Sequence, residues 1–96
     1  MITFKLHLRA PSVRFSKDDK IFLARIGKRI TEIRKERNLK QTELAFRCGM
    51  KKSNMNRIEK GKTNPTVLKL KRISKELGVH ITELLEDSRT SRKITT

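Results

Sequence analysis

The chain has no tryptophan, no tyrosine, a single cysteine, two prolines and only ten acidic residues among 96. Without aromatic anchors, a helix lying in a membrane interface is disfavoured, and no apolar run approaches the about 18 residues that a membrane span needs. The lone thiol, Cys48, excludes an internal disulfide and is typical of a reducing compartment. The start of the chain also lacks the apolar segment of a signal peptide. We therefore expect a cytoplasmic protein with no membrane partner.

Residue types that carry catalysis or bind metals are equally sparse. The two histidines, His7 and His80, have no neighbours that would complete a triad or a ligand set. There is no Cys-x-x-Cys or His-x-His spacing of the kind that holds zinc, and no glycine-rich phosphate loop. We expect no enzymatic activity, no catalytic residue, no metal and no cofactor.

What the chain does contain is positive charge. Lys and Arg number 25 against 10 Asp and Glu, which gives a formal net charge of +15 and a sequence pI of about 10.9. Such a field attracts polyanions, and nucleic acid is the commonest polyanion that a small protein meets. A basic surface that serves solubility alone is the alternative. The length allows one domain, so we expect no separate small-molecule effector domain.

Apolar spacing and helix-end signals predict five helices. The first follows the capping residue Ser16 and ends near Arg37, before Asn38. The others are predicted at 41–48, at 51–60, from about Pro65 to Leu77, and at 81–86. The residues that end or separate these later helices are Gly49, Gly61 and Gly78. The apolar residues of the fourth helix are Leu68, Leu70, Ile73 and Leu77.

Two segments lie outside the predicted bundle at 16–86. In the segment 1–15, a period of two, which is the signature of a strand, relates Ile2, Phe4, Leu6 and Leu8. A lone strand has no ladder partner in a helical chain. It can pair with its copy in a second subunit, pack against the bundle in cis, or stay disordered. The basic tail 87–96 is expected to be disordered.

The stretch 41–61, QTELAFRCGMKKSNMNRIEKG, places two short helical patterns on either side of Gly49. In the second pattern, Met55 and Ile58 face inward. The polar residues of that helix span an arc of about 140° on its other side, and they are Lys52, Ser53, Asn56 and Arg57. An anchored helix with a basic, hydrogen-bonding outer face is what entry into a DNA major groove requires.

Residues from about 26 to 85 resemble the Cro/C1-type (XRE family) helix-turn-helix of phage and bacterial repressors. The features that match, in order, are Gln41, Glu43-Leu44-Ala45, Gly49, Ile58-Glu59-Lys60-Gly61, Pro65 and Leu77-Gly78-Val79. The resemblance implies an all-α, five-helix lambda-repressor-like DNA-binding domain that serves a transcriptional regulator, expected to be a repressor. The strand-like extension at the amino terminus is not part of the family pattern.

The resemblance also implies roles for individual residues. The third helix would lie in the major groove, which makes Lys52, Ser53, Asn56 and Arg57 the base-contacting set. Phosphate contacts are expected at Gln41, Thr42, Arg47, Lys51, Lys60, Lys62 and Thr63. For Gln41, bracing of the third helix is the alternative. In the family, an ion pair ties the third helix to the first, and here it would join Arg34 to Glu59.

We expect a homodimer on a double-stranded, near-palindromic operator. The expected dimer surface is Val79, Ile81, Leu84 and Leu85, reinforced by the amino-terminal residues Ile2, Phe4, Leu6 and Leu8. The main alternative is an antitoxin that binds a protein partner as well as DNA, to which the extension would add a strand. A coactivator that barely touches DNA is a weaker one.

Two lysines depart from the family pattern. Lys40 and Lys51 stand where Ser or Thr commonly cap the second and third helices. A lysine side chain cannot accept a hydrogen bond, so each lost cap costs about 1 kcal/mol. Our hypothesis is that the two lysines compensate for the lost caps by attracting DNA phosphates more strongly.

Overall fold

The computed structural model describes residues 14–86, which contain five helices and, in that range, no strand. The helices are α2 (Lys17–Glu36), α3 (Gln41–Arg47), α4 (Lys52–Glu59), α5 (Val67–Leu77) and α6 (Ile81–Leu85). The all-α, five-helix prediction is confirmed. The predicted strand and the predicted tail lie outside the described residues, and so do the proposed interface residues Ile2, Phe4, Leu6 and Leu8.

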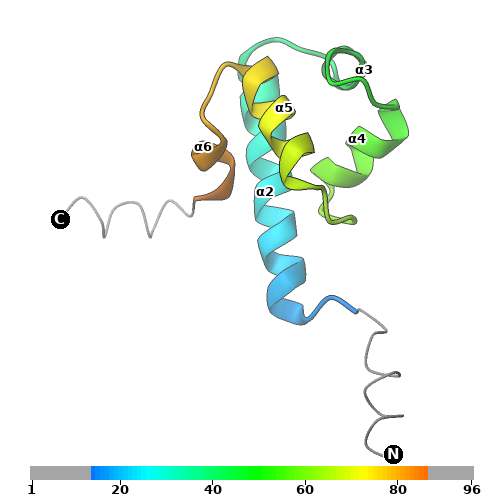
Figure 1. The fold of residues 1–96 in the computed structure, drawn as a ribbon, viewed down its shortest axis with the longest axis vertical. Coiled ribbons are helices and arrows are strands. Elements are labelled where there is room, and N and C mark those ends of the chain that lie inside the picture. Colours follow the sequence, from blue (N-terminus) through cyan, green and yellow to red (C-terminus); the bar gives the residue numbers. More distant parts are fainter. Residues whose placement is uncertain (1–13, 87–96) are drawn as a thin grey trace, which may run out of the picture.

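The long helix α2 is the scaffold on which the others pack (Figure 1). It contacts α4 on one side and α5 and α6 on the other, while α3 bridges α4 and α5. Its first turns project beyond the other helices (Figure 1). The short pair α3 and α4 is therefore held at one end of the molecule by contacts with both α2 and α5.

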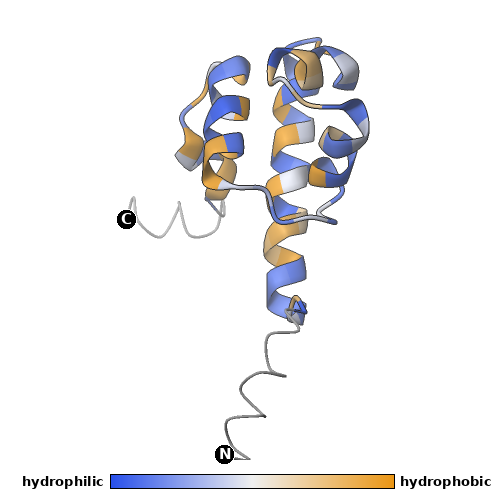
Figure 2. Cartoon of the chain, turned by 45° about the vertical axis from the view of Figure 1, so that its right-hand side comes forward, coloured by the Kyte–Doolittle hydropathy of each residue, from blue (hydrophilic) through white to orange (hydrophobic). Residues whose placement is uncertain are grey.

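Each helix contributes apolar residues to a single core, and Figure 2 shows hydrophobic segments alternating with hydrophilic ones along the helices. The stripe of α2 follows the spacing of three and four residues that an amphipathic helix requires. The core consists of Ile26, Ile30, Ile33, Leu44, Ala45, Cys48, Met55, Ile58, Leu70, Ile73, Leu77 and Leu84. Cys48 is 4% exposed, and burial, followed by the nearby Glu76 carboxylate, raises the pKa of its thiol to about 11.

The helix ends follow the signals in the sequence. Ser16 and Asp19 form a reciprocal capping box, with both backbone-to-side-chain hydrogen bonds at 3.0 Å. Asn38 ends α2 with a φ of 57°, and Gly49 ends α3 with a φ of 68°. Such positive φ values suit asparagine and glycine best, so the chain turns where the sequence predicts.

Two predictions for α5 were wrong. The helix begins at Val67, because the Thr66 hydroxyl accepts a hydrogen bond from the Lys69 N–H at 3.1 Å and caps it. Pro65 therefore precedes the cap instead of opening the helix. Leu68 does not join the apolar face of α5. It is 75% exposed, since the face toward the core is already formed by Leu70 and its neighbours one and two turns later.

The predicted dimer surface on α6 was wrong for Leu84. This residue is 1% exposed because α6 packs back on α2 and α5, where Leu84 fills the core of its own subunit. Val79 and Ile81 are partly buried against the same core. Of the four residues expected there, Leu85 is the one that remains well exposed, at 36%.

Candidate nucleic-acid interface

Helix α4, the predicted reading helix, is anchored to the core by one face. Met55 is fully buried and Ile58 is 2% exposed. The carboxyl end of the helix approaches the backbone of α2 so closely that a Cβ atom on Gly27 would overlap the Glu59 carbonyl oxygen. A Cβ on Gly61 would lie 2.6 Å from the Ala24 Cα. Two glycines thus allow a backbone-to-backbone contact that fixes where this end of α4 lies.

An ion pair ties α4 to α2 beside these glycines. The Arg34 Nε donates to Glu59 Oε2 at 2.8 Å, and its Nη2 donates to Oε1 at 3.2 Å. The two side chains are only 11% and 5% exposed. Arg34 Nη1 also donates to the Leu39 carbonyl at 2.8 Å, which fastens the loop before α3. This is the pair that the family resemblance implied, and its geometry is the bidentate form that arginine and carboxylate prefer.

The same carboxylate extends the network to α3 and to the outer side of α4. Glu59 Oε1 accepts hydrogen bonds from Thr31 Oγ1 at 3.1 Å and from Gln41 Nε2 at 3.0 Å. Asn56 Nδ2 in turn donates to Gln41 Oε1 at 3.4 Å. Gln41 therefore braces the reading helix, which is the second of the two roles considered for it from the sequence.

Four other polar residues of α4 form its outer face. Lys52, Ser53 and Arg57 are exposed, while Asn56 is partly buried by its contact with Gln41. The structure places these four side chains together on one side of the helix. An amide nitrogen carries two hydrogens, so Asn56 keeps a donor in addition to the one that it gives to Gln41.

The amino ends of α2 and α5 are capped by the side chains of Ser16 and Thr66, whereas those of α3 and α4 have no such cap. Within the described chain, neither Lys40 nor Lys51 caps its helix through its side chain. At α3, the Glu43 carboxylate accepts from the Lys40 N–H at 2.9 Å, which is the reciprocal half of a capping box. The first turn of α4 has no acidic residue. This amino end of α4 attracts anions, because the positive end of the helix dipole lies there together with Lys51 and Lys52.

Further candidate phosphate contacts lie on α3 and at the two ends of α4. Thr42, Lys51, Lys60 and Lys62 are exposed, and Thr63 is half-buried. Lys51 and Lys60 stand at the two ends of the helix, and Lys62 and Thr63 follow it directly.

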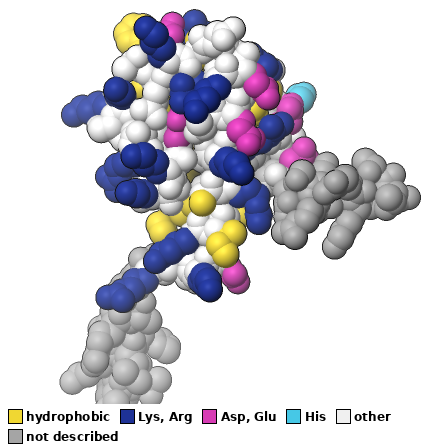
Figure 3. Space-filling view, turned by 180° about the vertical axis from the view of Figure 1, so that it is seen from behind, with side chains coloured by type: hydrophobic (Ala, Val, Ile, Leu, Met, Phe, Trp, Pro, Cys, Tyr) yellow, Lys and Arg dark blue, Asp and Glu magenta, His cyan; other side chains and the backbone are white. Residues whose placement is uncertain are grey.

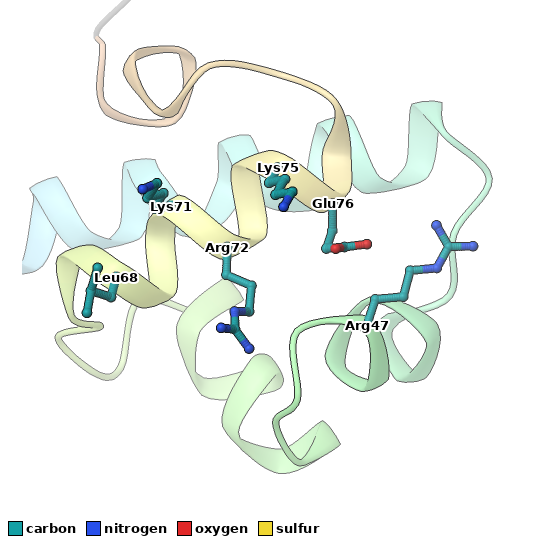
Figure 4. A pocket seen from close by; sticks show the side chains of 6 residues that line it. All are labelled: Arg47, Leu68, Lys71, Arg72, Lys75 and Glu76. Carbon is teal, nitrogen blue, oxygen red and sulfur yellow. The ribbon is translucent and has the colours of Figure 1, made fainter.

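Arg47 lies apart from this group. It is about 140° around α3 from Thr42, and it lines a hollow of about 420 Å³ between α3 and α5 (Figure 4). The other residues around this hollow are Leu68, Lys71, Arg72, Lys75 and Glu76. The structure therefore does not bring Arg47 together with Gln41, Thr42 and the outer face of α4.

Two residues that anchor α4 on α2, Gly27 and Thr31, were not predicted from the sequence. Gly27 did carry a signal, because a glycine inside a helix costs about 1 kcal/mol relative to alanine and often marks a close approach. Thr31 carried none, because its role depends on the distance between α2 and α4. Among residues 14–86 there is no cluster of three or more His, Cys, Asp or Glu suited to a metal ion. No helix in that range is both long and apolar enough to cross a membrane.

The sequence of the chain is similar to those of known proteins. Residues 30–84, more than half of the chain, match the model of a family described as helix-turn-helix. The transcriptional regulator SinR of Bacillus subtilis (strain 168) is 38% identical over 63 residues, which are 65% of this chain and 57% of SinR. Control protein C.BamHI of Bacillus amyloliquefaciens is 34% identical over 61 residues, 62% of this chain and 75% of that protein. The match thus spans little more than half of SinR.

A solved structure extends the comparison to three dimensions. It is a crystal structure of SinR, described as the master regulator for biofilm formation, in complex with DNA. It superposes with a TM-score of 0.60 at 39% identity, over 64% of this chain and 98% of that one.

Proposed function

Because the chain belongs to the helix-turn-helix family that residues 30–84 match, we propose that it is a transcriptional regulator that binds double-stranded DNA by sequence. It acts as a repressor in the cytoplasm, on a near-palindromic operator. The observation that carries the proposal is the network around Glu59. It holds α4 rigidly from two helices while leaving Lys52, Ser53 and Arg57 exposed, and a recognition element has to be held in position in this way.

The proposed base contacts follow from side-chain chemistry. Arg57 and Lys52 donate to guanine O6 and N7, and Asn56 suits adenine N6 and N7. Ser53 can donate or accept and discriminates weakly. Arg57 is the strongest candidate, because a planar guanidinium makes two parallel hydrogen bonds to one base.

The proposed phosphate contacts surround this set. Lys51 acts together with the amino end of α4, while Lys60, Lys62 and Thr63 act from its carboxyl side and Thr42 from α3. Such contacts fix the register of the protein on the duplex but carry no direct sequence information. Gln41 is assigned to bracing, since both ends of its amide are engaged. Arg47 is left out of the interface, because it lines the hollow beside α5.

A homodimer would place one α4 in each of two successive major grooves, about 34–36 Å apart. The antitoxin alternative finds no support, since the relatives reported above are named as a transcriptional regulator and a control protein.

The proposal is tested by selecting bound fragments from random DNA with the full chain and then titrating the enriched duplex at several salt concentrations. If each subunit contacts about four phosphates, log affinity falls with log salt at a slope of about −7 per dimer. Enrichment of one motif that reads as an inverted repeat supports the proposal. A selection that enriches no motif, together with a nearly flat salt dependence, overturns it.

A further inference from the structure

One face of α5 is turned away from the core. Five of its residues follow the spacing i, i+3, i+4, i+7 and i+8, which places them on one side of a helix. They are Leu68, Lys71, Arg72, Lys75 and Glu76. This face lies about 180° around α5 from the residues that the helix buries. Leu68 is 75% exposed, and the three cations are exposed as well, so the face is accessible to another molecule.

Two hollows border this face of α5. The first, of about 420 Å³, lies between the face and Arg47 of α3 (Figure 4). The second, of about 250 Å³, extends to the turn between α3 and α4, where Gly49 and Met50 line it. Leu68 and Arg72 line both hollows. The two hollows therefore adjoin each other and form one groove, which we call the α3–α5 groove.

The α3–α5 groove is positively charged. A single acid, Glu76, lines it together with five cations, which are Arg47, Lys69, Lys71, Arg72 and Lys75. Within residues 14–86, the side chains of these cations make no hydrogen bond or ion pair. Figure 3 shows the molecule from the side opposite to the view of Figure 1, and there several acidic side chains lie among the lysines and arginines. The charge of the groove is thus more one-sided than that of the face in Figure 3.

We propose that the α3–α5 groove is a docking site for a second protein, and that its occupant is an acidic peptide segment with an apolar side chain. Carboxylates of the segment pair with Arg47 and Arg72, because planar guanidinium groups bind carboxylates in bidentate form. The lysines of the groove add positive charge, which attracts the segment and favours its correct register. The apolar side chain of the segment covers the exposed Leu68.

Two observations favour a protein segment over DNA as the occupant. A phosphate backbone has no apolar group that would cover Leu68, whereas a peptide can carry carboxylates and an apolar side chain together. Arg47 also lies about 140° around α3 from Thr42, so the groove is separate from the proposed DNA-binding face. The chain therefore binds DNA and the acidic segment on different surfaces, and the inference does not depend on the proposed function.

The test begins with the full chain and a fluorescent synthetic peptide, EEDLEELEED, in anisotropy titrations without DNA. The peptide EEDSEESEED has the same charge but lacks the apolar side chains. We expect saturable binding of the leucine peptide, and binding at least about tenfold weaker for the serine peptide. The comparison separates docking in the groove from a general attraction between a basic chain and an acidic peptide.

The apolar contact is located by a matched pair of variants, Leu68→Ser and Val67→Ser. Both residues lie in the first turn of α5 and are 75% and 72% exposed, but Leu68 lines both hollows and Val67 lines neither. Leu68→Ser is expected to weaken binding of the leucine peptide about tenfold. Val67→Ser leaves it unchanged. Circular dichroism melts establish that each variant is folded.

The charged contact is located by a second matched pair, Arg72→Ser and Arg57→Ser. Each variant removes one exposed arginine, the first from the groove and the second from the outer face of α4. Arg72→Ser is expected to weaken binding of the leucine peptide about tenfold and to leave the salt dependence of DNA binding unchanged. Arg57→Ser lowers the affinity for DNA and leaves the affinity for the peptide unchanged.

Several results overturn the proposal. They are the absence of saturable peptide binding, equal binding of the leucine and serine peptides, and equal effects of Leu68→Ser and Val67→Ser. If Arg72→Ser reduces the salt slope of DNA binding by about 1, the groove holds a phosphate and belongs to the DNA interface instead. A chain that binds the leucine peptide in the groove but binds no DNA supports the docking site and refutes the proposed function.

Discussion

The side-chain amide of Gln41 joins the buried anchor of the reading helix to its outer face. It donates to Glu59 Oε1 at 3.0 Å and accepts from Asn56 Nδ2 at 3.4 Å. Glu59 is at the same time held by Arg34 of α2. The position of α4 is thus set by side chains from α2 and α3 together, and this connects the stability of the domain to what α4 presents to a ligand.

Replacement of Glu59 by alanine is expected to destabilise the domain by about 3–5 kcal/mol, because it leaves the Arg34 guanidinium buried without its charge partner. Urea unfolding monitored by circular dichroism measures the loss. The matched control is Glu36→Ala on α2. Its contact with Arg37 spans 3.9 Å between exposed side chains, and we expect a change below about 0.5 kcal/mol. Equal effects of the two substitutions would contradict the role given to the buried pair.

Gln41→Ala separates bracing from phosphate contact. If Gln41 braces Asn56 and Glu59, the variant relaxes the preference for the selected operator over altered sequences. A residue that only contacts phosphate would weaken binding to all sequences alike. Competition titrations with matched and altered duplexes measure the ratio. An unchanged ratio with uniformly lower affinity would return Gln41 to the phosphate set.

Gly27→Ala is expected to destabilise the domain by about 2 kcal/mol or more, in the range of overpacking a close contact. The added Cβ would overlap the Glu59 carbonyl oxygen, which belongs to the backbone and cannot turn aside. The helix propensity of alanine alone would instead stabilise α2 by about 1 kcal/mol. A lower midpoint of thermal unfolding is therefore expected, and a higher midpoint would contradict the role given to Gly27 in the contact between α2 and α4.

Lys51→Ser tests whether Lys51 strengthens DNA binding at the cost of the stability that a capping residue would give to α4. Serine supplies the missing cap, so the free protein should gain about 1 kcal/mol. The DNA-bound form should lose affinity, because a positive charge beside the amino end of α4 is gone. Melting curves of the free and bound protein measure both effects. A gain in stability with unchanged affinity would show that the lysine has no such role.

Much of the fold was predictable because its signals act locally. Ser16, Asn38 and the glycines that end α3, α4 and α5 each favour one backbone conformation at their own positions. The family resemblance is confirmed by the match of residues 30–84 to the helix-turn-helix family. The ion pair of Arg34 and Glu59, which that resemblance implied, is present.

The features that were not predictable depend on how the helices pack. Leu84 is buried because α6 packs back on α2 and α5, and the sequence does not show that packing. The exposure of Leu68 was predictable, because at 100° per residue it lies about 170° around the helix from the face of Leu70, Ile73 and Leu77. The choice between two roles for Gln41 likewise depended on its distance from Glu59. The family resemblance placed Arg47 among the phosphate contacts. In the structure, Arg47 lines the hollow beside α5.

The central claim is that the outer face of α4 reads bases while the basic residues around it hold phosphates. It is tested most directly by comparing Arg57→Ala with Lys62→Ala in titrations of the selected operator and of single-base variants of it. We predict that Arg57→Ala costs about 1–3 kcal/mol on the operator and relaxes preference at one base pair, and that Lys62→Ala weakens binding to every duplex alike. Uniform weakening by both substitutions, with sequence preference intact, would contradict the assignment of α4 as the reading helix.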